Sequence, residues 1–327
     1  TQGIVMKTNL KLISVVSMSF ILPAQAQVVS FDDYGPLQVY AQSPMQSLNL
    51  SPLLRSGFSL PQGQKEWYIT ANAASVWSES DELLADYYQN AISSGLKWQI
   101  TEDLLFDANY TWQFSGDNHL DSLTMWFHDA FGFDQNGRNQ QAKHQSQMRS
   151  EKYDIDVENF NGETLNNAFT AYLGYQLLQN EHHGISVGGT LYYKSVDSGP
   201  FADESFQQSV QINYGYHNGN HHVNSTLGIS FLHNKAPLSQ NSFESHYLTL
   251  ELGYEYRTGR HGWLAEYHRY DGMVSWDENF SEASNEALLG YRYYFNSSAI
   301  EFTMVENFLN MDNSADIAYV LGYRHKF

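Results

Sequence analysis

Histidine is the residue that invites a chemical interpretation of this chain, since 13 of its 327 residues are histidine and none is cysteine. Two adjacent pairs, His182–His183 and His221–His222, raise the question of a metal site. Neighbouring residues of a strand point to opposite faces, so neither pair can easily chelate one ion. Both pairs also fall at expected turns, where solvated polar residues are normal. We therefore expect no metal and no cofactor.

A second candidate is His144–Gln145–Ser146, a histidine two residues from a serine. A histidine base beside a serine nucleophile can hydrolyse an acyl ester when a third group orients the base. The surrounding residues are mostly polar and form no recognisable catalytic motif, so a solvated loop is the simpler interpretation. No residue is assigned a catalytic role, and a lipid-modifying hydrolase stays an alternative.

The third candidate, His128, lies in a segment with helical periodicity. Apolar residues recur at helical spacing from Leu120 to Phe131, which predicts an amphipathic helix of about three turns. Such a helix could cap a mouth, enter a lumen or lie at a membrane interface. His128 is either a ligand or proton site, or a hydrogen-bonded residue that holds the helix in place. The candidate residues of this loop are Asp121, Trp126, His128 and Arg138.

The elements that position these candidates must be strands, because apolar and polar residues alternate in much of the chain from Glu66 onward. Residues 248–257, for example, place leucine and tyrosine on one face and polar residues on the other. The lengths suit tilted transmembrane strands. We count twelve alternating stretches, at residues 66–77, 88–100, 103–115, 165–179, 185–197, 205–217, 221–234, 244–257, 262–272, 284–296, 299–308 and 315–327.

The connections between these stretches alternate between short and long, and the longest spans residues 116–166. Outer-membrane barrels have short periplasmic turns, longer external loops and an even number of strands. We therefore predict an all-β fold, a transmembrane antiparallel β-barrel of about 12 strands with a short amphipathic helix in a long external loop. A soluble β-sandwich also alternates, but it would not explain the two chain ends described next.

The carboxy-terminal strand alternates and ends on an aromatic residue. Tyr319, Leu321, Tyr323 and Phe327 share one face. This pattern resembles the signal by which the barrel assembly machinery recognises outer-membrane proteins. A strand that ends flush with the chain is also what closes a barrel.

The amino-terminal end has the three parts of a secretory signal peptide. Lys7 and Lys11 precede an apolar run from Leu12 to Leu22, and Ala24–Gln25–Ala26 fits a cleavage site. Residues 1–26 are therefore interpreted as a signal peptide, with residues 1–5 upstream of the true start at Met6. The run is too short for a transmembrane anchor.

Residues 27–64 fit neither the signal nor the strands. They contain four prolines, too many for paired strands. This arm is predicted to be either a periplasmic tail, which is slightly favoured, or a strap in the barrel mouth. The four leucines between residues 48 and 54 would be costly to leave in water. The barrel is assigned to residues 65–327.

The inner face of the barrel is expected to carry charges of both signs, which favours ion pairs between neighbouring strands. A twelve-strand lumen is intermediate between filled small barrels and open porins. With a net charge of −19, the chain has no electrostatic reason to bind nucleic acid. The predicted lumen charges are Asp107, Lys194, Glu251, Glu255, Arg257, Arg292, Glu301 and Arg324.

Motifs in the helix and in the arm resemble those of a known family. Leu120–Asp121, Phe127–His128, Phe131–Gly132 and Arg138 are similar to the motif of an uncharacterised family of Gram-negative outer-membrane β-barrels, catalogued as a domain of unknown function. Pro36–Leu37, Gln42 and Pro44 resemble its amino-terminal pattern. The resemblance implies the fold rather than an activity.

Three functions are compatible with these features. The first is a narrow channel or transporter for a small polar or amphipathic solute, with the loop helix as its constriction. The second is a lipid-modifying hydrolase of the outer membrane. The third is a structural barrel that binds an envelope partner. The expected partners are outer-membrane lipid and lipopolysaccharide, the assembly machinery and a small solute.

Overall fold

The chain forms a closed antiparallel β-barrel of twelve strands, as predicted, in a computed structural model. The structure describes residues 33–79, 83–132, 143–233, 243–307, 309–310, 313 and 315–327, without the side chains of Glu79, Phe127, His128, Ala130 and Phe131. No helix in this described part is both long and apolar enough to cross a membrane.

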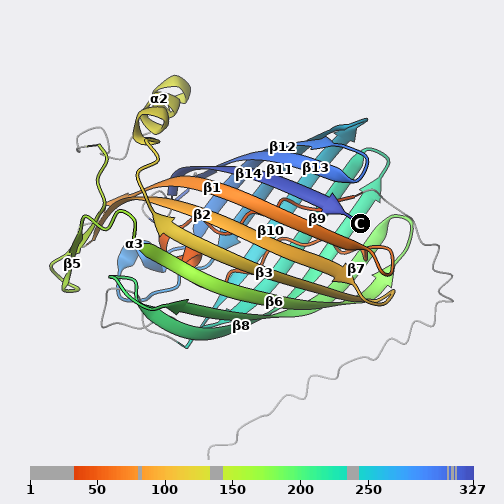
Figure 1. The fold of residues 1–327 in the computed structure, drawn as a ribbon, viewed down its shortest axis with the longest axis horizontal. Coiled ribbons are helices and arrows are strands. Elements are labelled where there is room, and N and C mark those ends of the chain that lie inside the picture. The colour runs from red at the N-terminus through yellow and green to blue at the C-terminus, as the bar shows by residue number, and fades with distance from the viewer. Residues whose placement is uncertain are drawn as a thin grey trace, which may run out of the picture.

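The twelve barrel strands correspond to the twelve alternating stretches, and each pairs with its neighbour in the chain (Figure 1). The barrel closes where the first strand pairs with the last, with Glu66 opposite Lys326. Lys65 and Phe327 exchange two backbone hydrogen bonds of 3.1 and 3.0 Å at this seam. The strands are β1 (Lys65–Glu79), β2 (Leu84–Gln99), β3 (Leu104–Ser115), β6 (Thr164–Gln179), β7 (His183–Val196), β8 (Asp203–Asn218), β9 (His221–Phe231), β10 (His246–Thr258), β11 (His261–Tyr270), β12 (Ser284–Tyr294), β13 (Ser298–Asn307) and β14 (Ala315–Lys326).

Alternation sorts the side chains into two environments. Along β10, Leu248, Leu250 and Leu252 are exposed on the outer face, and Thr249 and Glu251 are buried on the inner face. The outer face therefore suits lipid, and the inner face is polar, as expected for an outer-membrane barrel. Closure pairs each of the twelve barrel strands with a neighbour on both sides, which a membrane requires because lipid cannot satisfy backbone groups.

One end of the barrel carries both the short turns and the carboxy-terminus, and the other carries the long loops. Short turns face the periplasm in outer-membrane barrels, so the first is called the periplasmic end and the second the external end. The longest connection holds α2 (Asp121–Phe131) and a hairpin of β4 (Gln147–Ser150) and β5 (Ile155–Glu158). The helix agrees with its expected position, and β4 extends the sheet by pairing with β2.

The helix α2 lies outside the lumen, whereas the sequence suggested that it could constrict the lumen. The helix projects beyond the external ends of the strands and away from the carboxy-terminus (Figure 1). The segment that lies in the lumen is instead the arm, whose red and orange trace is visible between the strands (Figure 1). Two further short helices are α1 (Pro44–Ser47), in the arm, and α3 (Glu278–Ser281), in the loop before β12.

Candidate permeation path

The described arm, residues 33–64, rises through the lumen to α1 and returns to the periplasmic end. Glu266 of β11 accepts a hydrogen bond from the backbone N–H of Leu37, at 2.9 Å. Near the external end, Glu286 of β12 accepts from the N–H groups of Gln42 and Ser43, at 2.8 and 2.9 Å. An irregular segment has no strand partner, so side chains of the wall complete its backbone hydrogen bonds.

The returning limb is bound in the same way by the opposite wall. Gln207 of β8 accepts from the N–H of Leu50 at 2.7 Å, and Thr226 of β9 accepts from the N–H of Arg55 at 3.1 Å. At the periplasmic end, Gly57 lies against Gly184 and Gly215, where a Cβ atom would come within 2.3 Å of wall backbone. Side-chain bonds and this close contact therefore fix the position of the arm.

Apolar packing closes the external half of the lumen. Met45 and Leu48 of the arm belong to a buried cluster with residues of the external loops, among them Phe160, Phe201 and Phe280. The leucines of the arm, which would be costly to expose, are buried either in this cluster or nearer the periplasmic end. Leu48 and Leu54, for example, are only 2% and 1% exposed. The arm thus takes part in the hydrophobic core of the barrel.

Charged side chains line the periplasmic half. A chain of buried ion pairs crosses the inner faces of six strands with alternating sign, and its N···O distances lie between 2.7 and 3.4 Å. Each charge touches an opposite one, as a low-dielectric interior requires. The chain runs through Lys97, Glu66, Arg324, Glu301, Arg292 and Glu255.

Three cavities lie between the arm and the wall that β1, β2, β3, β6 and β7 form. A cavity of about 80 Å³ at the periplasmic end is lined by Glu66 and Lys97. A second of about 30 Å³ follows at Tyr68 and Asp107. A third of about 30 Å³ lies further along, between residues 70–72 of β1 and residues 111–113 of β3. The successive lining positions on β1 and β3 place the three cavities in a row along the barrel axis.

Arg55 separates the first two cavities, because its side chain lines both. Its Nη1 lies 2.7 Å from Oδ2 of Asp107, and its guanidinium carbon lies 3.7 Å from the ring centroid of Tyr172. The hydroxyl of Tyr68 donates to Oδ1 of Asp107 at 3.0 Å. Arginine, tyrosine and aspartate together therefore fill the lumen between the first two cavities.

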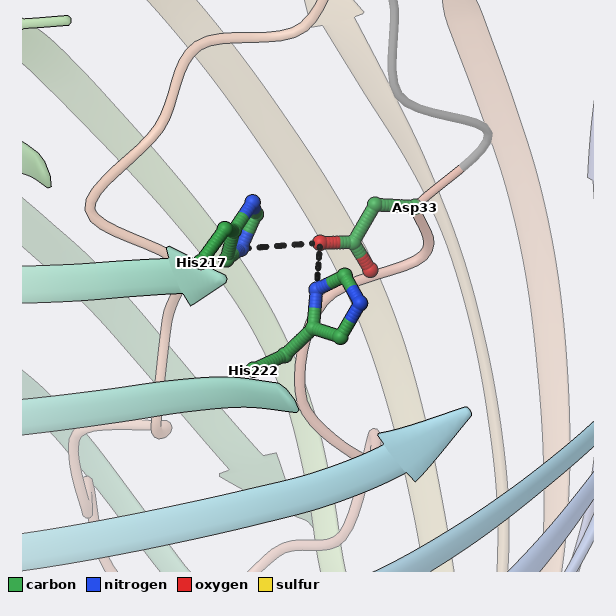
Figure 2. A group of neighbouring side chains, drawn as sticks. All are labelled: Asp33, His217 and His222. Atoms are coloured by element: carbon green, nitrogen blue, oxygen red, sulfur yellow. Dashed lines mark ion pairs between the residues drawn. The ribbon is translucent and has the colours of Figure 1, made fainter. Parts of the chain in front are cut away.

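The beginning of the described arm is held at the periplasmic mouth. Figure 2 shows Asp33 between His217 at the end of β8 and His222 near the start of β9. Its Oδ2 lies 3.2 Å from Nε2 of His217 and 3.5 Å from Nδ1 of His222. Burial acts to raise the pKa of Asp33, but hydrogen bonding and attraction to both histidines hold this pKa well below its ordinary value.

A second group of histidines lies in the external loop. Nδ1 of His144 is 3.2 Å from Oδ1 of Asp117, and Nδ1 of His119 is 3.3 Å from the same oxygen. Burial acts to raise the pKa of Asp117, but hydrogen bonds from the His119 backbone and the His144 ring lower it overall. His144 bonds in this group, and Ser146 lies 3.4 Å from Ser115. The proposed histidine–serine pair therefore has other partners in the structure.

The lumen charges expected from alternation lie on the inner face. Asp107, Lys194, Glu251, Glu255, Arg292, Glu301 and Arg324 are buried, and the Arg257 guanidinium lies 3.9 Å from the Tyr294 ring centroid. Of the loop-helix candidates, Asp121 is buried and Trp126 is 62% exposed. The side chain of His128 and the whole of Arg138 lie outside the described residues.

Sequence reasoning missed several residues that lie in the lumen. Glu66, Glu266 and Glu286 follow the same alternation as the charges that were identified, so this signal was available. Asp33 and Arg55 belong to a segment without periodicity, where no pattern indicates which side chains meet the wall. In the carboxy-terminal group, Leu321 and Phe327 are 59% and 62% exposed. Tyr319 and Tyr323 are half-buried.

Comparison with known proteins supports the fold. A family model described as "Protein of unknown function (DUF3187)" matches residues 12–327. The COG4313 outer membrane channel from Pseudomonas putida F1 has a TM-score of 0.52 at 11% identity, covering 83% of this chain and 97% of that chain. The translocator domain of autotransporter NalP from Neisseria meningitidis has a TM-score of 0.44 at 12% identity, with coverages of 81% and 89%. No curated protein matches the chain.

Proposed function

The chain belongs to the DUF3187 family of proteins of unknown function, and we propose that it is a gated outer-membrane channel for small polar solutes. In this proposal residues 33–64 form the constriction, in place of the loop helix suggested by the sequence. The structural neighbour from Pseudomonas putida is described as an outer membrane channel, which agrees with the proposal. Export by residues 1–26 and insertion through the terminal strand belong to the same hypothesis.

The row of three cavities carries the proposal. These cavities follow one wall from the periplasmic end and are interrupted by side chains rather than by backbone pairing. The cavities are small, about 80, 30 and 30 Å³, and side chains lie between them. The conformation is therefore a closed one.

The lining suggests the class of solute. Hydroxyl and amide side chains, including Thr70, Asn72 and Ser93, surround the third cavity. Charges of both signs lie at the first. Such a path offers hydrogen bonds without a net field of one sign, which favours a small neutral or zwitterionic solute over a large ion. Opening also requires the apolar cluster at the external end to move.

The arm is the part to remove in a test. The variant lacking residues 33–62 keeps all twelve strands, and it should form larger and steadier conductance steps in planar bilayers than the intact protein. It should also admit small sugars in liposome-swelling assays. Insertion is checked by heat-modifiable migration in electrophoresis.

A covalent lock keeps the test valid if the shortened chain does not fold. The hydroxyl oxygens of Ser43 and Ser284 are in direct contact, and the chain has no cysteine. A Ser43→Cys, Ser284→Cys variant can therefore fasten the top of the arm to β12 by a disulfide. Opening events should be absent when it is oxidised and return on reduction, and the single-cysteine variants are the controls. A folded arm-deleted barrel that conducts nothing, or a lock without effect on conductance, contradicts the proposal and favours a structural role.

A further inference from the structure

We propose that Asp33, His217 and His222 form a binding site for one divalent transition-metal ion, with Zn²⁺ as the representative, that fastens the arm to the β8–β9 hairpin. The site is independent of whether the barrel conducts, because it requires only that these three side chains meet. Figure 2 shows all three directed toward a common point at the periplasmic mouth.

The geometry of the three donor atoms fits an ion. One ligand atom from each residue can be chosen so that all lie within 4.8 Å of one another. Zinc bonds of about 2.0–2.1 Å at tetrahedral angles place two ligand atoms about 3.3 Å apart. The distances from Asp33 Oδ2 to the two imidazole nitrogens are 3.2 and 3.5 Å. A small closure of the existing arrangement would therefore complete three corners of a tetrahedron.

The hairpin register explains why the two histidines can act together although adjacent histidines cannot. His217 of β8 and His222 of β9 are partners across the turn. Partners across a hairpin project from the same face of the sheet, and their ring centroids are 4.4 Å apart. His221, next in the chain, points outward and contacts Tyr254 instead. Only the adjacent histidines are evident in the sequence, which is why no metal was expected there.

The surroundings hold the ligands in place. The second carboxylate oxygen of Asp33 accepts the backbone N–H of Gly35 at 2.7 Å, and the Phe58 ring stacks on His217 with centroids 4.1 Å apart. Groups that orient ligands in this way are a regular part of metal sites. Asp33 and His217 also line the first cavity, which leaves room for water or an exchangeable ligand at a fourth corner.

Ligand chemistry selects the kind of ion. Two imidazoles and one carboxylate suit Zn²⁺, Ni²⁺ or Cu²⁺, and they do not suit Mg²⁺ or Ca²⁺, which prefer oxygen ligands. The group of Asp117, His119 and His144 also brings three donors together. Its histidine side chains are 75% and 46% exposed, so water competes there, and the buried group is the stronger candidate.

A bound ion would add a link between the beginning of the described arm and the β8–β9 hairpin. On the other side of the same arm residues, Lys326 of β14 donates to the Asp33 carbonyl at 2.6 Å. Arg324 of β14 donates to the Pro36 carbonyl at 2.8 Å. The ion would therefore secure the arm between β14 and the β8–β9 hairpin across the mouth.

The experiment uses the full mature barrel in detergent, treated with a chelator and then titrated with Zn²⁺ and with Co²⁺. Zn²⁺ binding is measured by calorimetry, and the visible absorption of Co²⁺ reports a tetrahedral site. We expect one tight site that is weakened at least about 100-fold by Asp33→Asn or His222→Gln, since these remove a ligand rather than an orienting group. Mg²⁺ should not compete.

The matched controls are His221→Gln, which changes the neighbouring histidine, and Asp117→Asn, which disables the exposed group. Both should keep the tight site and the Co²⁺ spectrum. Zn²⁺ should also slow proteolysis of the arm in the wild type and not in His222→Gln, which separates metal binding from a simple ion pair. The proposal is overturned if the wild type binds no Zn²⁺ tightly, if binding survives both ligand substitutions, or if Asp117→Asn alone abolishes it.

Discussion

Removing the side chain of Arg55 should widen the periplasmic half of the path that the arm obstructs. Arg55 is the residue that lines both of the first two cavities, so Arg55→Ala merges voids of about 80 and 30 Å³ and adds the volume of the lost side chain. The resulting space continues from the periplasmic mouth past Asp107. The apolar cluster at the external end still has to move before the path opens, so we expect Arg55→Ala to enlarge the open steps in planar bilayers relative to those of the wild type.

The same substitution should destabilise the barrel by an amount that can be worked out from the ion pair. The side chains of Arg55 and Asp107 are 11% and 2% exposed, with N and O atoms 2.7 Å apart. Removing one partner of a buried pair leaves the other charge uncompensated and costs about 3–5 kcal/mol. Tyr68 still donates to Asp107, which favours the lower part of that range.

A double variant separates the loss of charge from the loss of volume. Arg55→Met, Asp107→Leu fills the same space with apolar side chains, and such replacements of buried ion pairs are often neutral or stabilising. It should therefore keep near wild-type stability in urea titrations followed by electrophoretic mobility, and it should stay closed. In that case the conductance depends on the volume of the side chain at residue 55 and not on its charge.

Two results would refute this reasoning. If Arg55→Ala and the double variant conduct equally, the charge and not the side-chain volume controls the path. If neither differs from the wild type while the arm-deleted barrel conducts, Arg55 does not limit the conductance.

Three other changes to the chain test the structure. Gly57→Val should displace the returning limb of the arm and destabilise the barrel by about 1–3 kcal/mol or more, because the added side chain overpacks against backbone. The displacement is measured by the protease sensitivity of the arm. Gly189→Ala is the control, since its added Cβ would meet its nearest neighbour at 3.5 Å, and it should leave the arm protected. Deleting residues 120–132 should leave conductance unchanged, because α2 stands clear of the strands (Figure 1); a rise in conductance would return the constriction to the loop. Deleting Phe327 or introducing Tyr323→Asp should lower the amount of heat-modifiable protein in the outer membrane, and normal accumulation of both would contradict the assembly role of the terminal strand.

Local pattern was sufficient to predict the wall of the barrel. Each strand alternates between lipid and lumen, so the side chains of the twelve strands carry a period of two that can be read without knowing their partners. Short turns between strands make each strand pair with the next. The inner position of Glu251 or Arg292 follows from the same period, and so does the exposure of Leu250.

The course of the arm through the lumen was decided by tertiary structure alone. The arm has no repeating pattern, because its backbone hydrogen bonds end on side chains such as Glu286 and Gln207, far away in sequence. The sequence by itself determined that four leucines in this segment needed burial, and it could not say where. Only the closed barrel brings Asp33 beside His222 and Arg55 beside Asp107, because these pairs depend on how the chain crosses an enclosed space and not on any local periodicity.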